Sequence, residues 1–193
     1  LHNRSVEMAK KYGVELVVRS SLTSEEGTVV KEVVKMEKML ITGVAADRNT
    51  VRISAIGVKD EPGIAFKIFN TLAKNNINVD IILQSVGRNG TKDISFTVSE
   101  EDLKEALAIL EEKKEVLTIK ELTYSTDVAK VSIVGAGMLS NPGVAAKMFE
   151  SLFNSNININ MISTSEIRIT VLIDEKDTEK AMIAIHDGFG LND

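Results

Sequence analysis

The chain contains one stretch of sequence twice, and this internal repeat limits the possible folds more than any other feature. Residues 51–85 and 131–165 align without a gap, and 14 of the 35 aligned positions are identical. The chain's two prolines lie at matching positions, each followed by glycine, in Pro62-Gly63 and Pro142-Gly143. Two copies are too few for a solenoid, so the repeat predicts two similar small domains.

The first copy begins a pattern in which strands and helices follow one another. Residues 51–56 alternate apolar and polar side chains with the period of two that is typical of a strand. After Pro62-Gly63 the apolar residues recur at helical spacing over residues 64–73. Two strands, a helix with Ser99 as its N-cap and a closing strand are then predicted, at residues 79–86, 91–98, 99–110 and 116–122. This β-α-β-β-α-β order predicts an α+β fold of the ferredoxin-like type.

The second copy lacks the last element of this pattern. It is predicted to contain a strand, a helix, two strands and a final helix, at residues 130–134, 144–153, 159–163, 167–173 and 178–189. A sheet edge without a partner exposes backbone hydrogen-bonding groups. We therefore expect the second domain to be discontinuous, with Leu16-Val17-Val18 as its fourth strand. We also expect residues 41–46 to form a β-hairpin with residues 51–56.

The composition excludes several kinds of site. The chain has no cysteine, which rules out disulfides and thiolate metal sites and suits a reducing cytoplasm. Its net charge is −5 without a basic block, which argues against nucleic acid and anionic membrane surfaces as partners. No apolar run approaches the roughly 20 residues that cross a bilayer. His2 and His186 have no second ligand at metal spacing, so no metal site is predicted.

Each Pro-Gly lies where a strand ends and a helix begins, and the first has chemistry that suits a free amino acid. Glycine lets a ligand approach the backbone, and the unpaired N–H groups at the start of a helix attract a carboxylate. Asp60 lies beside Pro62-Gly63 and can pair with an ammonium group, whereas the second copy has Ser140 at that place. The alternative is that each Pro-Gly only makes a tight turn into a helix.

Tandem β-α-β-β-α-β units with this loop resemble ACT domains, which sense small molecules in amino-acid metabolism. Over nearly its whole length the chain also resembles the regulatory half of aspartokinase. The motifs that carry this resemblance are Arg4-Ser5-Val6-Glu7, Ala9-Lys10-Lys11-Tyr12-Gly13-Val14, Val17-Val18-Arg19-Ser20-Ser21, Gly27-Thr28, Ile41-Thr42-Gly43-Val44-Ala45 and Ser163-Thr164-Ser165-Glu166-Ile167-Arg168-Ile169. Asn3 departs from the proline that is usual in the family, and the lysine-phenylalanine-glycine-glycine nucleotide motif of the catalytic domain does not occur.

The resemblance implies a regulatory region of an aspartate kinase, or its separate regulatory β subunit. The parent enzyme would transfer the γ-phosphate of ATP to the side-chain carboxylate of aspartate, with ATP and magnesium bound by the catalytic domain and no cofactor bound by this chain. The chain itself would bind lysine, threonine or both as feedback inhibitors. It would be cytoplasmic and would form a homodimer through its ACT domains, next to the catalytic domain or subunit.

The resemblance also implies which residues bind the effector. The first loop and the strand after the first helix would contribute Asp60, Glu61, Pro62, Gly63, Ile64, Ala65 and Gln84. Asn158 and Ile159 would offer backbone groups from the partner chain. Asp80, Ser165 and Glu166 fall at positions that are linked in the family to the response to lysine. No catalytic residue and no metal ligand is expected in this chain.

With this resemblance the chain divides into four parts. Residues 1–14 are expected to be the end of a linker helix from the kinase domain. Residues 15–47 would give a strand, at about 15–21, to the second ACT domain and lead into the first. Residues 48–125 would form the first ACT domain and residues 126–193 the second. Because the first residue is not methionine and no leader follows it, we expect a fragment or a processed product.

Two other functions are alternatives to a regulatory region of aspartokinase. A stand-alone ACT module that regulates a different enzyme would share these sequence features, and the upstream reading frame would distinguish the two. An enzyme with a ferredoxin-like fold is the second alternative, but the sequence suggests no nucleophile-base pair and no metal cluster. A fold alone does not identify a function, so the expectation depends on the motifs.

Overall fold

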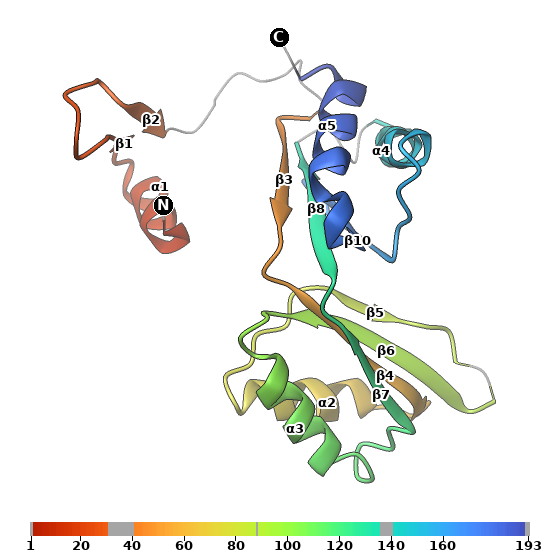
Figure 1. The fold of residues 1–193 in the computed structure, drawn as a ribbon. Coiled ribbons are helices and arrows are strands. Elements are labelled where there is room, and N and C mark those ends of the chain that lie inside the picture. The colour runs from red at the N-terminus through yellow and green to blue at the C-terminus, as the bar shows by residue number, and fades with distance from the viewer. Residues whose placement is uncertain (1, 31–40, 88, 136–140, 192–193) are drawn as a thin grey trace. The chain divides into compact units, whose positions relative to one another are not determined.

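The structure is a computed structural model that describes residues 2–30, 41–87, 89–135 and 141–191. It divides into two compact units, Leu1–Lys38 and Met39–Asp193. Figure 1 shows the elements, which are α1 (Asn3–Tyr12), β1 (Leu16–Val18), β2 (Thr28–Val30), β3 (Gly43–Asp47), β4 (Val51–Lys59), α2 (Ile64–Ala73), β5 (Ile82–Gln84), β6 (Thr91–Val98), α3 (Leu103–Glu112), β7 (Glu121–Ser125), β8 (Val128–Val134), α4 (Val144–Asn154), β9 (Met161–Thr164), β10 (Arg168–Asp174), η1 (Glu175–Asp177) and α5 (Thr178–Phe189).

The smaller unit combines α1 with a two-stranded hairpin. β1 pairs antiparallel with β2, so Leu16–Val18 has a partner close by in the sequence. Gly27 turns the chain into β2 with a φ of 84°, and a Cβ at this position would overlap the carbonyl oxygen of Val18. The prediction that Leu16–Val18 completes the sheet of the second domain is therefore wrong.

The first ferredoxin-like domain is built from β4 to β7. Its sheet has the strand order β5-β6-β4-β7, with every neighbouring pair antiparallel. Both helices, α2 and α3, contribute to the core beneath the sheet (Figure 1), which includes Ile53, Ile68, Leu72, Ile94, Phe96 and Leu110. Two strands differ from the prediction: β5 is shorter than residues 79–86, and β7 begins after most of the predicted residues 116–122.

The second domain has the same architecture, but its strands come from two separate parts of the chain. Its sheet has the order β3-β8-β10-β9, and α4 and α5 cover its buried face. β3 pairs with β8 from Gly43↔Val134 to Asp47↔Lys130. The predicted α+β fold of two ferredoxin-like units, with the second discontinuous, is confirmed. The donated strand is Gly43–Asp47, so the predicted hairpin between residues 41–46 and 51–56 is wrong.

Two chain connections run between the domains. β3 continues into β4, and β7 continues into β8, so the antiparallel pair β3–β8 of one sheet leads into the antiparallel pair β4–β7 of the other. A small buried cluster, Ile81, Val128, Met161 and Leu172, lies between the domains. Because β3 precedes the whole first domain in sequence, the first domain is an insertion between two neighbouring strands of the second sheet, β3 and β8.

Candidate functional site

The first Pro-Gly makes an open turn between β4 and α2. The backbone N–H of Asp60 donates to the carbonyl oxygen of Gly90 at 2.9 Å, which fixes the start of the turn. Gly63 is the N-cap of α2, with φ 90° and ψ −9°. A Cβ on Gly63 would meet no atom within 4 Å, so there is free space next to the helix N-terminus. Pro62 is exposed beside this space.

The N-terminus of α2 is chemically suited to an anion. Gly63 has no side chain that could bind the first N–H groups, and the first turn contains no acidic residue. Ile64 is 1% exposed and belongs to the core, and Ala65 packs against the core. The N–H of Ile64 donates to the carbonyl oxygen of Glu61 at 3.4 Å, so Ala65 is the better placed of the two to offer a backbone N–H group to a ligand, and the Ile64 side chain is not available.

The carboxylate of Asp60 is held by a lysine that the sequence analysis did not select. Lys92 of β6 places its Nζ 2.9 Å from Asp60 Oδ1. The Lys92 side chain is 10% exposed, whereas the Asp60 side chain is 45% exposed. Asp60 Oδ2 lies against Gly87, where a Cβ would overlap it. The sequence shows only that Lys92 is a charged residue within a strand. Its partner could not be predicted, because the partner depends on the register of that strand.

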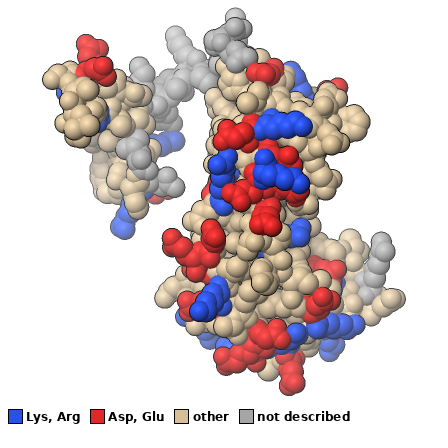
Figure 2. Space-filling view, viewed as in Figure 1, with Lys and Arg blue, Asp and Glu red and all other residues tan. Residues whose placement is uncertain are grey.

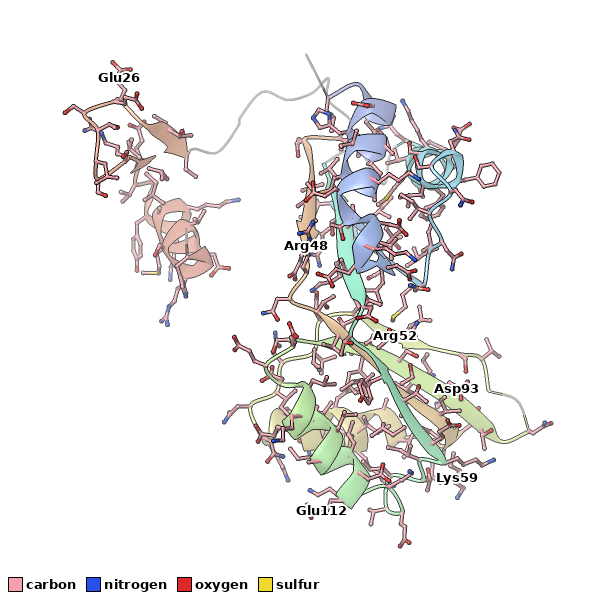
Figure 3. The ribbon with its side chains drawn as sticks, viewed as in Figure 1. Glu26, Arg48, Arg52, Lys59, Asp93 and Glu112 are labelled. Atoms are coloured by element: carbon pink, nitrogen blue, oxygen red, sulfur yellow. The ribbon has the colours of Figure 1, made fainter. Side chains whose placement is uncertain are left out.

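Glu61 is the other carboxylate of this turn and already has two basic partners. Its Oε2 is 2.9 Å from Nζ of Lys59 and its Oε1 is 3.4 Å from Nζ of Lys67. The hydrogen bonds from Lys59 and then Lys67 hold the pKa of Glu61 below its usual value, and the bond to Glu61 raises the pKa of Lys59. Figure 3 labels Lys59 at the end of β4 that leads into the turn. Glu61 is therefore less available to a ligand cation than Asp60.

Gln84 lies at the end of the edge strand β5. It pairs with Ile94 of β6, the strand that also carries Lys92, and its side chain is exposed. The structure thus places Gln84 one strand away from the Asp60 turn, within the same sheet.

A second group of charged residues lies at the junction of the two domains. Nζ of Lys130 is 2.7 Å from Asp80 and 2.9 Å from Asp47. Burial lowers the pKa of Lys130, but the hydrogen bonds that Lys130 donates to Asp80 and Asp47 outweigh this effect and leave the pKa above its usual value. Lys130, at 12% exposed, therefore connects the loop before β5 of the first domain with the sheet of the second domain.

Two of the residues predicted for the lysine response meet at Arg168. Arg168 Nη2 is 3.8 Å from Asp80 Oδ1. The backbone N–H and the hydroxyl of Ser165 donate to the carbonyl oxygen of Arg168, at 2.7 Å and 3.2 Å. Glu166 is exposed in the same turn between β9 and β10. Asp80 and Ser165, from different domains, thus contact different parts of Arg168, the guanidinium and the backbone carbonyl, and Glu166 is next to Ser165 in the sequence.

The remaining predicted residues belong to the second domain. Asn158 is exposed in the connection between α4 and β9, and Ile159 packs partly against the core. Across the described parts of this single chain, no hydrogen bond or ion pair joins either residue to Asp60 or Gly63. Ser140, the counterpart of Asp60 in the second copy, lies outside the described residues.

Neither metal nor membrane features are evident in the described ranges. No group of three or more His, Asp or Glu residues there could hold a metal ion. None of the helices in those ranges combines the length and apolar composition that a membrane span requires. Basic and acidic side chains are interleaved on the face of Met39–Asp193 that Figure 2 shows.

Two ferredoxin-like domains in tandem, each with a helix that begins at a glycine turn, define a protein of the ACT type. Residues 51–113 and 131–189 match the ACT domain family, which is more than half of the chain. The chain therefore belongs to the ACT domain family.

The similar proteins are aspartokinases and their regulatory subunits. Aspartokinase of Bacillus sp. (strain MGA3) is 46% identical over 193 residues, which cover 100% of this chain and 47% of that protein. The crystal structure of aspartokinase alpha and beta subunits is 47% identical with a TM-score of 0.73, covering 78% of this chain and 99% of that one. The ligand-free regulatory subunit of aspartate kinase from Thermus thermophilus is 43% identical, with the same TM-score and coverage.

These similarities assign the chain a regulatory role in aspartate kinase. The chain spans about half of the length of the curated aspartokinases that it matches. It covers 99% of the matched chain in the structure of aspartokinase alpha and beta subunits and 99% of the regulatory subunit from Thermus thermophilus. The matched region is therefore the regulatory part of these enzymes.

Proposed function

We propose that the chain is the effector-sensing region of an aspartate kinase and that it binds lysine, threonine or both. Binding would shift the kinase to a less active state, so that end products inhibit the first step of their own synthesis. The catalytic part, outside this chain, would transfer the γ-phosphate of ATP to the side-chain carboxylate of aspartate. Coupling between two such sites typically amounts to about 1–3 kcal/mol.

The turn at Asp60 carries this proposal because it offers a partner for each charge of a free amino acid. The open N-terminus of α2 at Gly63 suits the α-carboxylate. The Asp60 carboxylate, about half exposed, suits the α-ammonium group. Both features belong to one short turn, so a single small zwitterion would reach both.

We further propose that Asp80, Ser165 and Glu166 contact the side chain of the effector. The exposed residues Ser165 and Glu166 present a hydroxyl and a carboxylate, which suit the ammonium group of a lysine side chain. To reach the carboxylate of Asp80, that ammonium group would displace Lys130 or Arg168. Gln84 would reach the same ligand from β5. Asn158 of a partner chain would complete the site with backbone groups, together with Ile159.

Calorimetric titration with lysine and threonine, singly and together, tests the proposal. Asp60→Asn keeps the shape of the side chain but removes its charge, so we expect the affinity to fall roughly ten- to 150-fold, or about 1.5–3 kcal/mol. Glu112→Gln, labelled in Figure 3 at the exposed end of α3, removes one charge from the same domain and should have no effect. Equal affinity in Asp60→Asn and the wild type would mean that the Pro-Gly is only a turn.

In the intact parent enzyme, Asp60→Asn should relieve feedback inhibition without changing uninhibited turnover. The reason is that Asp60 lies in a surface turn of the regulatory region and contributes no side chain to the core. Steady-state rates with and without each amino acid would measure this. Inhibition by the same concentrations as in the wild type would contradict the proposal.

We propose a homodimer that forms through the ACT domains. The edge strands and the turns that follow them carry exposed apolar side chains, among them Ile82, Val86, Ile162 and Ile167 at 40–89% exposed. Two copies of such a surface can form an isologous interface. Light scattering at increasing protein concentration should show a dimer, and a monomer at every concentration, with and without lysine and threonine, would contradict the proposal.

We also propose that the small N-terminal unit contacts the catalytic domain or subunit. None of residues 2 and 4–30 is buried, and Tyr12, Val14 and Leu22 are 65%, 59% and 93% exposed. Apolar side chains on a unit of this size need a partner surface to become buried. Protection of residues 2–30 from hydrogen exchange should therefore rise when the catalytic part is present.

A further inference from the structure

Lys92 and Asp60 form an ion pair inside the turn that we propose as the effector site. Lys92 lies opposite Val58 in the pairing of β4 with β6, just after the irregularity between Ala55 and Val58. This register directs the lysine side chain toward the end of β4, where its Nζ is 2.9 Å from Asp60 Oδ1. Lys92 is therefore a fixed part of the domain, held by the sheet.

The Asp60 carboxylate is restrained on both of its oxygens. Lys92 binds Oδ1, and Gly87 leaves just enough room for Oδ2 because it has no Cβ. The backbone N–H of Asp60 is bound to Gly90. The acid is thus preorganised, and its open side faces solvent while Lys92 remains 10% exposed.

We propose that Lys92 is an internal competitor for the ammonium group of the effector and so sets the concentration at which the site fills. This inference rests on the proposed function, in which Asp60 receives the α-ammonium group. A carboxylate has lone pairs for two donors, but two ammonium groups on one carboxylate are only a few ångströms apart and repel each other. The Lys92 ammonium would therefore weaken binding of any ligand that places its α-ammonium group on Asp60.

The exposure of the two side chains favours competition over direct binding of the ligand by Lys92. A ligand reaches the exposed side of Asp60, whereas the Lys92 ammonium is covered by the domain. The α-carboxylate of the ligand has the open N-terminus of α2 as its partner. Lys92 is thus a specificity-determining residue that acts through Asp60.

The test is calorimetric titration of the wild type, Lys92→Met and Lys92→Arg with lysine and threonine. Lys92→Met has nearly the same length but no charge, so we expect about tenfold tighter binding, equal to about 1.4 kcal/mol. Lys92→Arg keeps the charge and should stay within about threefold of the wild type. Lys92→Gln is a second uncharged variant, and circular dichroism identifies the variants that are folded.

The 2-hydroxy acids that correspond to lysine and threonine separate competition from a structural effect. They keep the carboxylate and the side chain but lack the α-ammonium group. If Lys92 acts by charge competition, Lys92→Met should not tighten their binding. Tightening of the hydroxy acids and the amino acids by the same factor would show that Lys92 only shapes the loop, and would overturn the inference.

The outcomes distinguish this inference from the proposed function. If the wild type binds an amino acid and Asp60→Asn weakens it, but neither uncharged Lys92 variant binds more tightly, the inference is wrong and the proposed function stands. If Asp60→Asn leaves the affinity unchanged, or if no variant binds either amino acid, both are wrong. Tighter binding by Lys92→Met or Lys92→Gln, limited to ligands with the α-ammonium group, supports both.

Discussion

The two Pro-Gly turns have nearly the same backbone but different chemical surroundings. Gly63 and Gly143 have φ values of 90° and 100°, both have ψ −9°, and both begin a helix without a side-chain cap. A Cβ would meet no atom within 4 Å at either position. The first turn carries Asp60, paired with Lys92, whereas the second copy has Ser140 in the sequence at the place of Asp60. Pro-Gly thus fixes the turn, and the flanking residues decide which ligand the turn suits.

The two domains also differ in the origin of their fourth strand. The first domain takes β7 from its own continuous sequence, and the second takes β3 from the segment before the first domain. Both strands occupy the same place in their sheets, next to the strand that opens the copy. The same fold is therefore reached by a local route and by a long-range route, which predicts different responses to truncation.

Truncation of the N-terminal segment should give the largest difference in stability between the two domains. Deleting residues 1–47 removes β3 and the buried Ile41, and leaves β8 without its neighbour. Burial of one isoleucine stabilises by about 1.5–3 kcal/mol, so with the lost strand hydrogen bonds we expect the second domain to lose at least ~3 kcal/mol. Hydrogen exchange of residues 128–191 should speed up strongly.

Deleting residues 1–30 is the matched control for this truncation. It removes α1, β1 and β2 but keeps β3, so exchange in residues 128–191 should stay as in the full chain. Unchanged protection after the longer deletion would show that β3 is not needed for the second sheet.

Matching core leucines should lose similar amounts of stability in the two domains. Leu72 and Leu152 are 0% exposed at corresponding places on α2 and α4. Replacing either with alanine should cost about 2–5 kcal/mol, because each change removes buried methyl groups and leaves a cavity. Urea denaturation should give one cooperative transition for each variant, since the domains share crossing strands. A transition in two steps would show that the crossing strands do not couple the domains.

Replacing either of the two turn glycines with alanine should lower the stability least, and by the same amount in both domains. Gly63→Ala and Gly143→Ala meet free space, so only the left-handed backbone opposes them, at about 1–2 kcal/mol. Gly43→Ala is the matched control, because a Cβ there also meets no atom within 4 Å and the backbone lies in β3. That variant should be neutral or slightly more stable in thermal unfolding. A neutral result at Gly63 or Gly143 would contradict the strain argument.

The parts of the fold that depend on neighbouring residues could be predicted from the sequence. The helical spacing over residues 64–73 coincides with α2. The prediction of Ser99 as the N-cap of the next helix is wrong, because α3 begins at Leu103 with Asp102 as its N-cap, and Ser99 only accepts the N–H of Asp102 at 3.3 Å in the turn before it. The repeat predicted two domains of one fold, and the sequence placed Asp60 beside a helix N-terminus. These features follow from periodicity and turn chemistry, which act over a few residues.

Strand partners could not be predicted in this way. β3 and β4 follow each other with a short connection, which is typical of a hairpin, yet β3 pairs with β8 in the other domain. An alternating strand shows which face is buried but not which sheet it joins. Leu16–Val18 likewise pairs with residues 28–30, close by in the sequence, and not with the distant second domain.

The sequence by itself determined that this chain folds as two ferredoxin-like domains and that one turn carries an acid beside a helix N-terminus. Only the tertiary structure decided that β3 completes the second sheet and that Lys92 lies against Asp60. It also placed Asp80 of the first domain 3.8 Å from the guanidinium of Arg168 in the second. The physical reason is that helices and turns are set by contacts within a few residues, whereas ion pairs and sheet order depend on the register between strands that are far apart in the sequence.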